Sequence, residues 1–251
     1  NRLWKVSDKT WLGALQRKMK SATLFIADGH HRYETALAYQ ALRSKNEKGA
    51  LGSRPFDYVM MMFVAMEDPG LVILPTHRML PARLVTEPYE ILARLTSLGR
   101  VVEVSESLTG EKPWEAMQKL GAKAPVLGFS IDGKKLYVLQ FSKKALNSPL
   151  LKGLSSAQKG LDVALLHKLI LEPWFGITRE KVEHELSFTS QAEVAVTRLR
   201  KQDFACAFFL NPTRIEQLRQ VAMRKERMPQ KSTFFYPKLI TGMVINDLSA
   251  F

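Results

Sequence analysis

Residues 126–141 read VLGFSIDGKKLYVLQF, two apolar runs separated by Asp132 and Gly133. An Asp-Gly pair between apolar runs favours a type I′ turn, in which both central residues have positive φ. The stretch therefore predicts a β-hairpin, with strands over Val126–Ile131 and Lys135–Phe141. The two strands of a hairpin are antiparallel neighbours in a sheet.

Helical and strand patterns alternate on both sides of this hairpin. Apolar runs over 56–66 and 71–74 flank Asp68-Pro69-Gly70, which predicts that the two runs pair as a second hairpin. Mixed helices and strands with at least two hairpins favour an α+β fold, in which helices pack on mixed sheets, over a purely parallel sheet. The other strands expected are 23–27, 100–104, 185–189 and 204–210, and the later helices expected are 87–98, 111–120, 162–171 with Asp162 as N-cap, 191–200 and 213–226.

Two more helices are expected near the N-terminus. The first begins with Ser7 or Asp8 as N-cap and ends before Thr23. The second follows the strand over 23–27 and repeats apolar residues at helical spacing. We expect one face of each helix to be buried, formed by Trp11, Leu12, Leu15 and Met19 in the first and by Tyr33, Leu37 and Ala41 in the second.

Length and composition indicate a globular protein with a sizeable core. The chain has 251 residues, of which 46% are apolar. Its polar, Ser- and Gly-containing stretch over 147–160 predicts a boundary between a lobe of residues 1–150 and an α/β lobe of residues 151–251, although one continuous domain is the alternative. No apolar run approaches the roughly 20 residues that span a bilayer, and the N-terminus lacks a basic segment followed by an apolar one, so we expect a cytoplasmic protein without membrane contact.

The formal charge of +13 indicates attraction to anionic partners. Lysines and arginines are spread along the chain in modest clusters, which are usually solvated helix faces. The charge therefore favours an anionic ligand without naming it. Cys206 lies in an apolar run and is expected to be a buried, unreactive thiol.

Asp28-Gly29-His30-His31-Arg32 places three basic side chains where a helix begins. The first turn of a helix carries free N–H groups and the positive end of the macrodipole, so each basic side chain there costs roughly 0.3–1 kcal/mol. An anion such as phosphate or carboxylate would remove that cost. In the alternative interpretation Asp28 is an N-cap, the histidines are structural and the nearby Glu34 is a solvated helix residue.

Two later stretches carry similar chemistry. Pro75-Thr76-His77-Arg78 follows an apolar strand, and residues 229–238 hold two lysines, two hydroxyls and three aromatic rings between prolines. Both are candidate walls of one phosphate pocket; a surface loop and an ordinary ordered loop are the respective alternatives. The chain lacks a Walker A loop, a G-x-G-x-x-G fingerprint, an H-E-x-x-H zinc motif and paired C-x-x-C motifs.

The stretches IADGHHRYETA (26–36), PTHR (75–78) and MPQKSTFFYPKL (228–239) together resemble the prokaryotic family called domain of unknown function 1015. The resemblance covers essentially the whole chain. Members of that family are longer at the N-terminus, so the resemblance implies that this chain is a fragment lacking a first portion.

The Asp-Gly-His-His-Arg element is in turn similar to the phosphate-binding turn of the ParB and sulfiredoxin superfamily, which implies such an element around residues 20–45. Some relatives are described as serine kinases that use pyrophosphate. By resemblance, Asp28, His31 and Glu34 are the expected catalytic residues, and Asp28 also orients serine or Mg²⁺. The expected phosphate-binding residues are Gly29, His30 and Arg32 of the turn, with His31 beside them, and His77, Arg78, Lys231, Ser232, Thr233 and Lys238 of the later stretches.

The expected function is a phosphotransferase with an alcohol group as acceptor. Its substrate would be free L-serine, its donor pyrophosphate or a nucleotide, and its cofactor Mg²⁺. The alternatives are a ParB-like protein that binds nucleic acid or nucleotides, and a regulator that binds a small anionic metabolite without catalysis. The sequence leaves the oligomeric state open.

Overall fold

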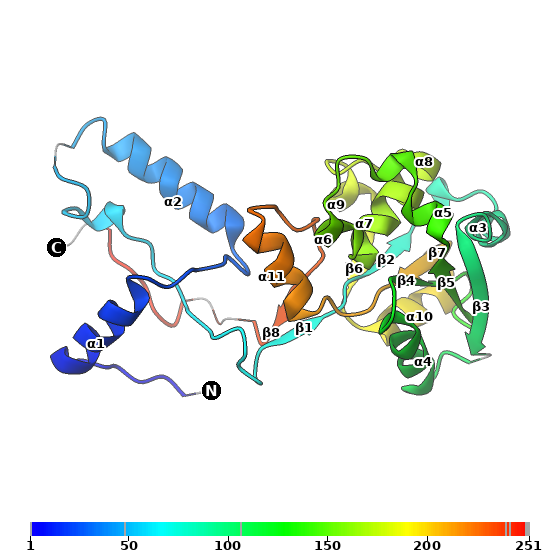
Figure 1. The fold of residues 1–251 in the computed structure, drawn as a ribbon, viewed down its shortest axis with the longest axis horizontal. Coiled ribbons are helices and arrows are strands. Elements are labelled where there is room, and N and C mark those ends of the chain that lie inside the picture. Colours follow the sequence, from blue (N-terminus) through cyan, green and yellow to red (C-terminus); the bar gives the residue numbers. More distant parts are fainter. Residues whose placement is uncertain (1, 48, 106, 239, 241, 249–251) are drawn as a thin grey trace. The chain divides into compact units, whose positions relative to one another are not determined.

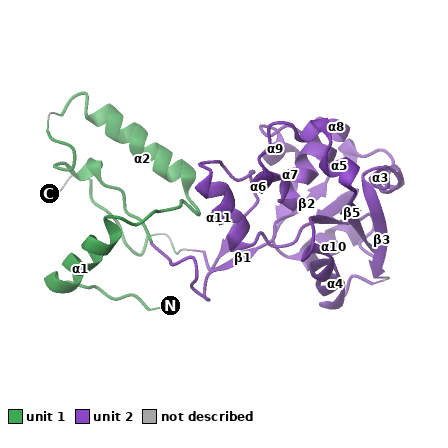
Figure 2. Cartoon of the chain, in the orientation of Figure 1, with its two compact units in different colours: residues 1–62, 240–251 green, residues 63–239 purple. Residues whose placement is uncertain are grey.

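The computed structural model describes residues 2–47, 49–105, 107–238, 240 and 242–248. The chain forms two compact units, unit 1 (residues 1–62 and 240–251) and unit 2 (residues 63–239), shown in Figure 2. The division therefore lies near residues 62 and 239 rather than near 150, and the polar stretch over 147–160 lies inside unit 2.

Unit 1 contains the two expected N-terminal helices, α1 (Lys9–Met19) and α2 (His30–Arg43), and the short 3₁₀ helix η1 (Pro55–Asp57). The predicted N-cap is confirmed, because the Asp8 carboxylate accepts a hydrogen bond of 2.7 Å from the Trp11 N–H. The predicted burial of the apolar faces is wrong: no residue of either helix is buried within the described part of the chain. Spacing predicted which residues share a face, but burial also needs a partner element.

Two strands expected in this part of the chain are absent from the described structure. Residues 23–27 and 58–64 are not in strands, and the side chains of residues 58–64 are all exposed. A strand forms only where another strand accepts and donates its backbone hydrogen bonds. No described residue pairs with either segment, so both stay outside a sheet.

The second predicted hairpin is also wrong. Strand β1 (Val72–Leu74) pairs with β8 (Phe234–Tyr236), not with the run over 56–66. Ile73 lies opposite Phe235, which is buried. A partner far along the chain thus replaces the neighbouring one, a choice that local sequence does not reveal.

Unit 2 is built on a six-stranded sheet in the order β3-β5-β4-β7-β2-β6, with antiparallel neighbours throughout. The expected α+β class is confirmed. The strands are β2 (His77–Leu80), β3 (Gly99–Ser105), β4 (Val126–Ser130), β5 (Leu136–Phe141), β6 (Ser187–Thr189) and β7 (Cys206–Phe209). The helices are α3 (Pro88–Leu95), α4 (Lys112–Gly121), α5 (Lys143–Leu146), α6 (Ser156–Lys159), α7 (Asp162–Leu166), α8 (Glu172–Phe175), α9 (Val182–Glu185), α10 (Ala192–Arg200) and α11 (Ile215–Met223), with 3₁₀ turns η2 (Ala82–Leu84) and η3 (Pro149–Leu151) and the π-helical η4 (His167–Leu171).

Helices cover both faces of this sheet (Figure 1). Side chains alternate between the faces of a strand. In β4, Phe129 accordingly belongs to the cluster that α3, α7 and η4 complete, whereas Val126 belongs to the cluster of α4 and α10. All residues of β2, β4 and β7 are buried, so the centre of the sheet is the core of unit 2.

The hairpin of β4 and β5 is confirmed, and its register places Phe129 opposite Tyr137. The predicted type I′ turn is wrong. The connection has φ of +69° at Gly133, but Asp132 is not among the residues with positive φ. Instead the Ser130 hydroxyl accepts the Gly133 N–H and the Asp132 carboxylate accepts the Lys134 N–H, so side chains close a longer turn.

Among the described residues, none of the helices combines the length and apolar character needed to cross a membrane.

Candidate functional site

The turn before α2 has the geometry of an anion-receptive helix start. Gly29 is the N-cap of α2, with φ of +82°, and supplies no side-chain cap to the first N–H groups. The Arg32 guanidinium folds back over this glycine: a Cβ on Gly29 would lie 2.8 Å from Arg32 Nη2. The left-handed backbone conformation favours glycine at this position, and the lack of a side chain lets the arginine approach the backbone closely.

Charged side chains surround this helix start and remain in contact with solvent. Arg32 Nη2 lies 3.7 Å from Asp28 Oδ2, and His31 Nδ1 lies 3.5 Å from Glu34 Oε2. His30 and His31 are exposed, and α2 has no acidic residue in its first turn. The structure thus brings together the whole predicted group from Asp28 to Glu34 on one exposed turn.

Asp28 is the expected ligand of Mg²⁺. No group of three His, Cys, Asp or Glu side chains in the described part of the chain could hold a metal by itself. Mg²⁺ in phosphoryl-transfer sites is commonly held by one or two carboxylates together with substrate phosphates and waters. The single carboxylate of Asp28, next to a helix start that favours phosphate, fits that kind of site and not an all-protein cage.

Unit 2 holds a second group of predicted residues around Arg78. The Arg78 side chain is 1% exposed. Its guanidinium donates hydrogen bonds to the backbone carbonyls of Thr76, Gln230 and Lys231, and its Cζ lies 5.6 Å from the centre of the Phe188 ring. Burial lowers the pKa of Arg78 to about 9.

The segment over 229–233 is fastened beside Arg78 by further hydrogen bonds. The Ser232 hydroxyl donates to the Pro229 carbonyl at 2.6 Å, and the Thr213 hydroxyl donates to the Ser232 carbonyl at 2.8 Å. Lys231 has φ of +52°, which orients its carbonyl group within this tight arrangement. Two stretches that the sequence marked separately, 75–78 and 229–238, therefore meet in unit 2.

The remaining predicted phosphate ligands of unit 2 have other partners. His77 is buried, its Nδ1 accepts the Leu210 N–H, and burial with the neighbouring Arg78 lowers its pKa to about 3. Lys231 Nζ lies 3.2 Å from Glu183 Oε1, and Lys238 Nζ lies 4.6 Å from the centre of the Phe234 ring. Thr233 is half-buried. We leave His77 out of the ligands proposed below, because its imidazole is neutral and already hydrogen-bonded.

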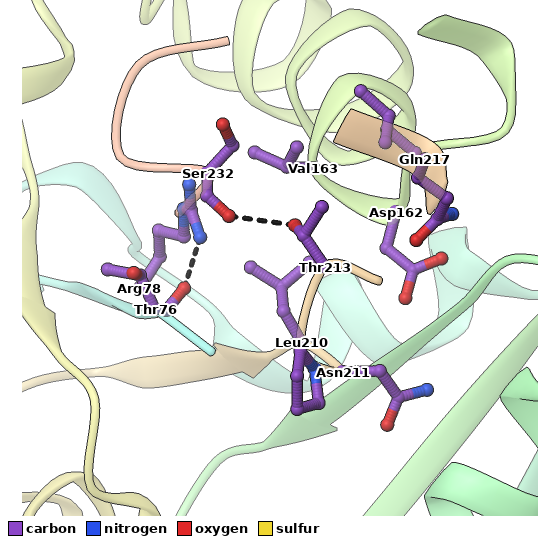
Figure 3. A pocket seen from close by; sticks show the side chains of 11 residues that line it. Thr76, Arg78, Asp162, Val163, Leu210, Asn211, Thr213, Gln217 and Ser232 are labelled. Atoms are coloured by element: carbon purple, nitrogen blue, oxygen red, sulfur yellow. Dashed lines mark hydrogen bonds between the residues drawn. The ribbon is translucent and has the colours of Figure 1, made fainter. Parts of the chain in front are cut away.

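A small cavity opens beside Arg78, as Figure 3 shows. Its volume is about 20 Å³, room for one or two water molecules. Its polar lining consists of Thr76, Arg78, Asp162, Asn211, Thr213, Gln217 and Ser232.

Sequence reasoning missed four of these polar residues. Asp162 was expected only as an N-cap, although it is the first residue of α7, and Asn211, Thr213 and Gln217 were not considered. Asn211 and Thr213 follow the apolar run that ends at Leu210. The signal that selected residues 75–78, polar side chains after an apolar strand, applies equally to them.

Asp162 is the titratable carboxyl of this cavity. Burial raises its pKa to about 7, and the hydrogen bonds from the Val126 and Asn211 N–H groups and the charge of Arg214 only partly oppose that effect. Near neutral pH the carboxyl is therefore about half protonated. A protonated carboxyl can donate a hydrogen bond as well as accept one.

Two more buried groups of unit 2, one of them the predicted Cys206, have shifted pKa values. Cys206 is buried in β7 and burial raises the pKa of its thiol, which confirms the expected buried strand and keeps the thiol protonated. His167 is buried, and burial together with Arg78 lowers its pKa to about 3.

Comparisons with known proteins identify the family. The chain matches the family described as "Protein of unknown function (DUF1015)" over residues 1–164. No curated protein matches. Among solved structures, it is similar to a conserved hypothetical protein from Pyrococcus furiosus, with 14% identity, a TM-score of 0.44 and coverage of 84% of this chain and 68% of that one. It is also similar to a free serine kinase in complex with AMP, with 14% identity, a TM-score of 0.42 and coverage of 92% of this chain and 81% of that one. From the family match over residues 1–164, we conclude that this chain belongs to the DUF1015 family.

Proposed function

We propose that this protein is a small-molecule phosphotransferase that converts free L-serine to O-phosphoserine, with pyrophosphate or a nucleotide as the phosphoryl donor. The observation that carries the proposal is the start of α2, where an uncapped helix N-terminus, Gly29 and Arg32 form one phosphate-receptive turn. The resemblance of this turn to the phosphate-binding turn of the ParB and sulfiredoxin superfamily, whose members include kinases of free serine, supports the choice of acceptor.

The chemistry asks mainly for positioning and neutralisation of charge. In the proposed reaction the serine hydroxyl oxygen forms a bond to the terminal phosphorus of the donor, and the bridging P–O bond breaks to release phosphate or the shortened nucleotide. The backbone N–H groups of α2 and the Arg32 guanidinium hold the transferred phosphoryl group, assisted by His30 and His31. Bound Mg²⁺ would neutralise donor phosphates, with Asp28 as its protein ligand.

Glu34 is the proposed general base that takes the hydroxyl proton. It lies one helical turn after His31 and contacts that imidazole at 3.5 Å. Its side chain is half exposed, so a serine molecule can reach it without displacement of core residues. His31 would then orient the carboxylate and share the charge of the proton.

The direct test is an assay of the full chain with L-serine, Mg²⁺ and, in separate reactions, pyrophosphate, ADP or ATP. Phosphorus NMR or mass spectrometry would detect O-phosphoserine. We expect product with at least one donor, and none when Mg²⁺ is chelated. Absence of product with all three donors would refute the proposal. Consumption of the donor that persists without serine would show that another acceptor, such as water, is used.

Replacing Arg32 with alanine is expected to lower kcat/KM about 10- to 100-fold, because a charge-assisted hydrogen bond contributes about 1.5–3 kcal/mol. Steady-state kinetics with the active donor measure the effect. Arg17→Ala is the matched control: Arg17 is an exposed helical arginine of the same unit that lies away from the turn. Equal activity of the two variants would contradict the role assigned to Arg32.

A further inference from the structure

Arg78 is a buried cation without a matching anion. No Asp or Glu carboxylate forms an ion pair with it among the described residues, and its buried Nε has no hydrogen-bond partner there. Three backbone carbonyls contact the guanidinium, but carbonyl dipoles leave its full positive charge in place. A buried charge is costly unless a counter-charge accompanies it.

The cavity beside Arg78 is a place where a bound anion would balance this positive charge. It opens to solvent, and its volume of about 20 Å³ gives room for one or two oxygen atoms of a group that approaches from solvent, not for a whole metabolite. Hydroxyl and amide side chains line it, as Figure 3 shows for Thr213, Asn211 and Ser232. We propose that this cavity is a binding site for the oxyanion group of a small ligand, a carboxylate or a phosphoryl group, held by the buried Arg78 and the polar side chains beside it.

The other titratable groups around the cavity are consistent with a negatively charged ligand. His77 and His167 are neutral near pH 7, because burial and Arg78 lower both of their pKa values to about 3. Arg214 is close enough to Asp162 to act on its charge. Asp162 is the carboxyl that lines the cavity, and uptake of a proton there turns it from a repelling group into a donor. Binding of an oxyanion should therefore be stronger below the pKa of Asp162 than above it.

This proposal concerns residues of unit 2 alone and does not depend on the proposed phosphotransfer at α2. The experiment therefore uses the full chain carrying Arg32→Ala, so that the turn of α2 contributes little to anion binding. Isothermal titration calorimetry with sulfate tests whether the site binds a phosphoryl-like group, and titration with acetate tests whether it binds a carboxylate. Neither probe changes its charge between about pH 6 and about pH 8, so any pH dependence belongs to the protein.

We expect at least one probe to bind, and Arg78→Gln in the same background to weaken its binding about tenfold or more, as loss of a charge-assisted hydrogen bond requires. Arg100→Gln is the matched control, because Arg100 is an exposed strand arginine of the same unit, and it should leave binding unchanged. Binding of sulfate alone assigns the site to phosphoryl groups, and binding of acetate alone assigns it to carboxylates. Absence of binding by both probes, or equal binding by the Arg78 variant, would overturn the proposal.

Circular dichroism shows whether Arg78→Gln folds, because it also removes the hydrogen bonds that fasten Gln230 and Lys231. If it does not fold, Asp162→Asn provides the decisive comparison. Binding of the probe to the protein that retains Asp162 should weaken several-fold from about pH 6 to about pH 8. Binding of the same probe to the Asp162→Asn variant should stay constant. The same pH dependence in both proteins would overturn the proposal.

Discussion

Replacement of Phe129 by alanine is expected to lower the free energy of unfolding of unit 2 by about 3–5 kcal/mol. Phe129 is fully buried in the middle of β4, and its ring lies 5.1 Å from that of Phe208 on the neighbouring strand β7. It points into the cluster completed by α7 and η4, so truncation would leave a cavity between the sheet and these helices. Domains are typically stable by only 5–15 kcal/mol, so the loss is large.

Urea denaturation followed by far-UV circular dichroism would measure this loss. Tyr89→Ala is the control, because Tyr89 is also a large aromatic residue of unit 2 but is 66% exposed. It should change the free energy of unfolding by no more than about 0.5 kcal/mol. A loss below about 1 kcal/mol for Phe129→Ala would show that β4 is not the centre of the core.

Asp162→Asn should remove a marked pH dependence of stability. In the folded protein the pKa of Asp162 is raised to about 7 from the ordinary value of 3.8. Between these values the folded state binds a proton that the unfolded state has released, so a rise in pH through this range lowers the free energy of unfolding. Each pKa unit corresponds to about 1.4 kcal/mol, which sets an upper limit of about 4 kcal/mol. Because the residue keeps some exposure to solvent, we expect roughly 2–4 kcal/mol.

The measurement is the difference in free energy of unfolding between the two proteins, taken from urea denaturation at about pH 4 and about pH 8. Asparagine keeps one side-chain oxygen that can accept the Val126 N–H, and any loss of the hydrogen bond from Asn211 changes stability similarly at both pH values when Asp162 of the parent is set aside. His77 and His167 also titrate, but they are present in both proteins and their effect cancels in the difference. A difference that stays constant with pH would show that Asp162 ionises normally.

Several helices and strands of unit 2 could be predicted well. Their sequences show a clear periodicity, and the two strands of the hairpin are neighbours in the sequence. The hairpin of β4 and β5 and helices α4 and α10 lie close to their expected bounds. The apolar runs over 23–27 and 58–64 show the same composition but form no strand in the described structure. Composition makes a strand possible, whereas a ladder requires a second strand at the right distance.

The candidate sites show a similar division. The turn from Asp28 to Glu34 could be recognised because its residues are consecutive and a helix start brings them together by local geometry. The cavity at Arg78 could be recognised only in part, because Asp162 and Thr213 reach it from distant points of the chain. The positions of these residues in the sequence do not reveal that they are close in space.

By itself, the sequence determined the α+β class, the hairpin over 126–141 and the start of α2 after the Asp28-Gly29 turn, since each follows from the preferences of neighbouring residues. Only the tertiary structure decided that β1 pairs with β8 and that Arg78 is buried beside Asp162. The physical reason is that the pairing of strands distant in the sequence, and the desolvation of a buried side chain, both depend on which segments pack together and exclude water.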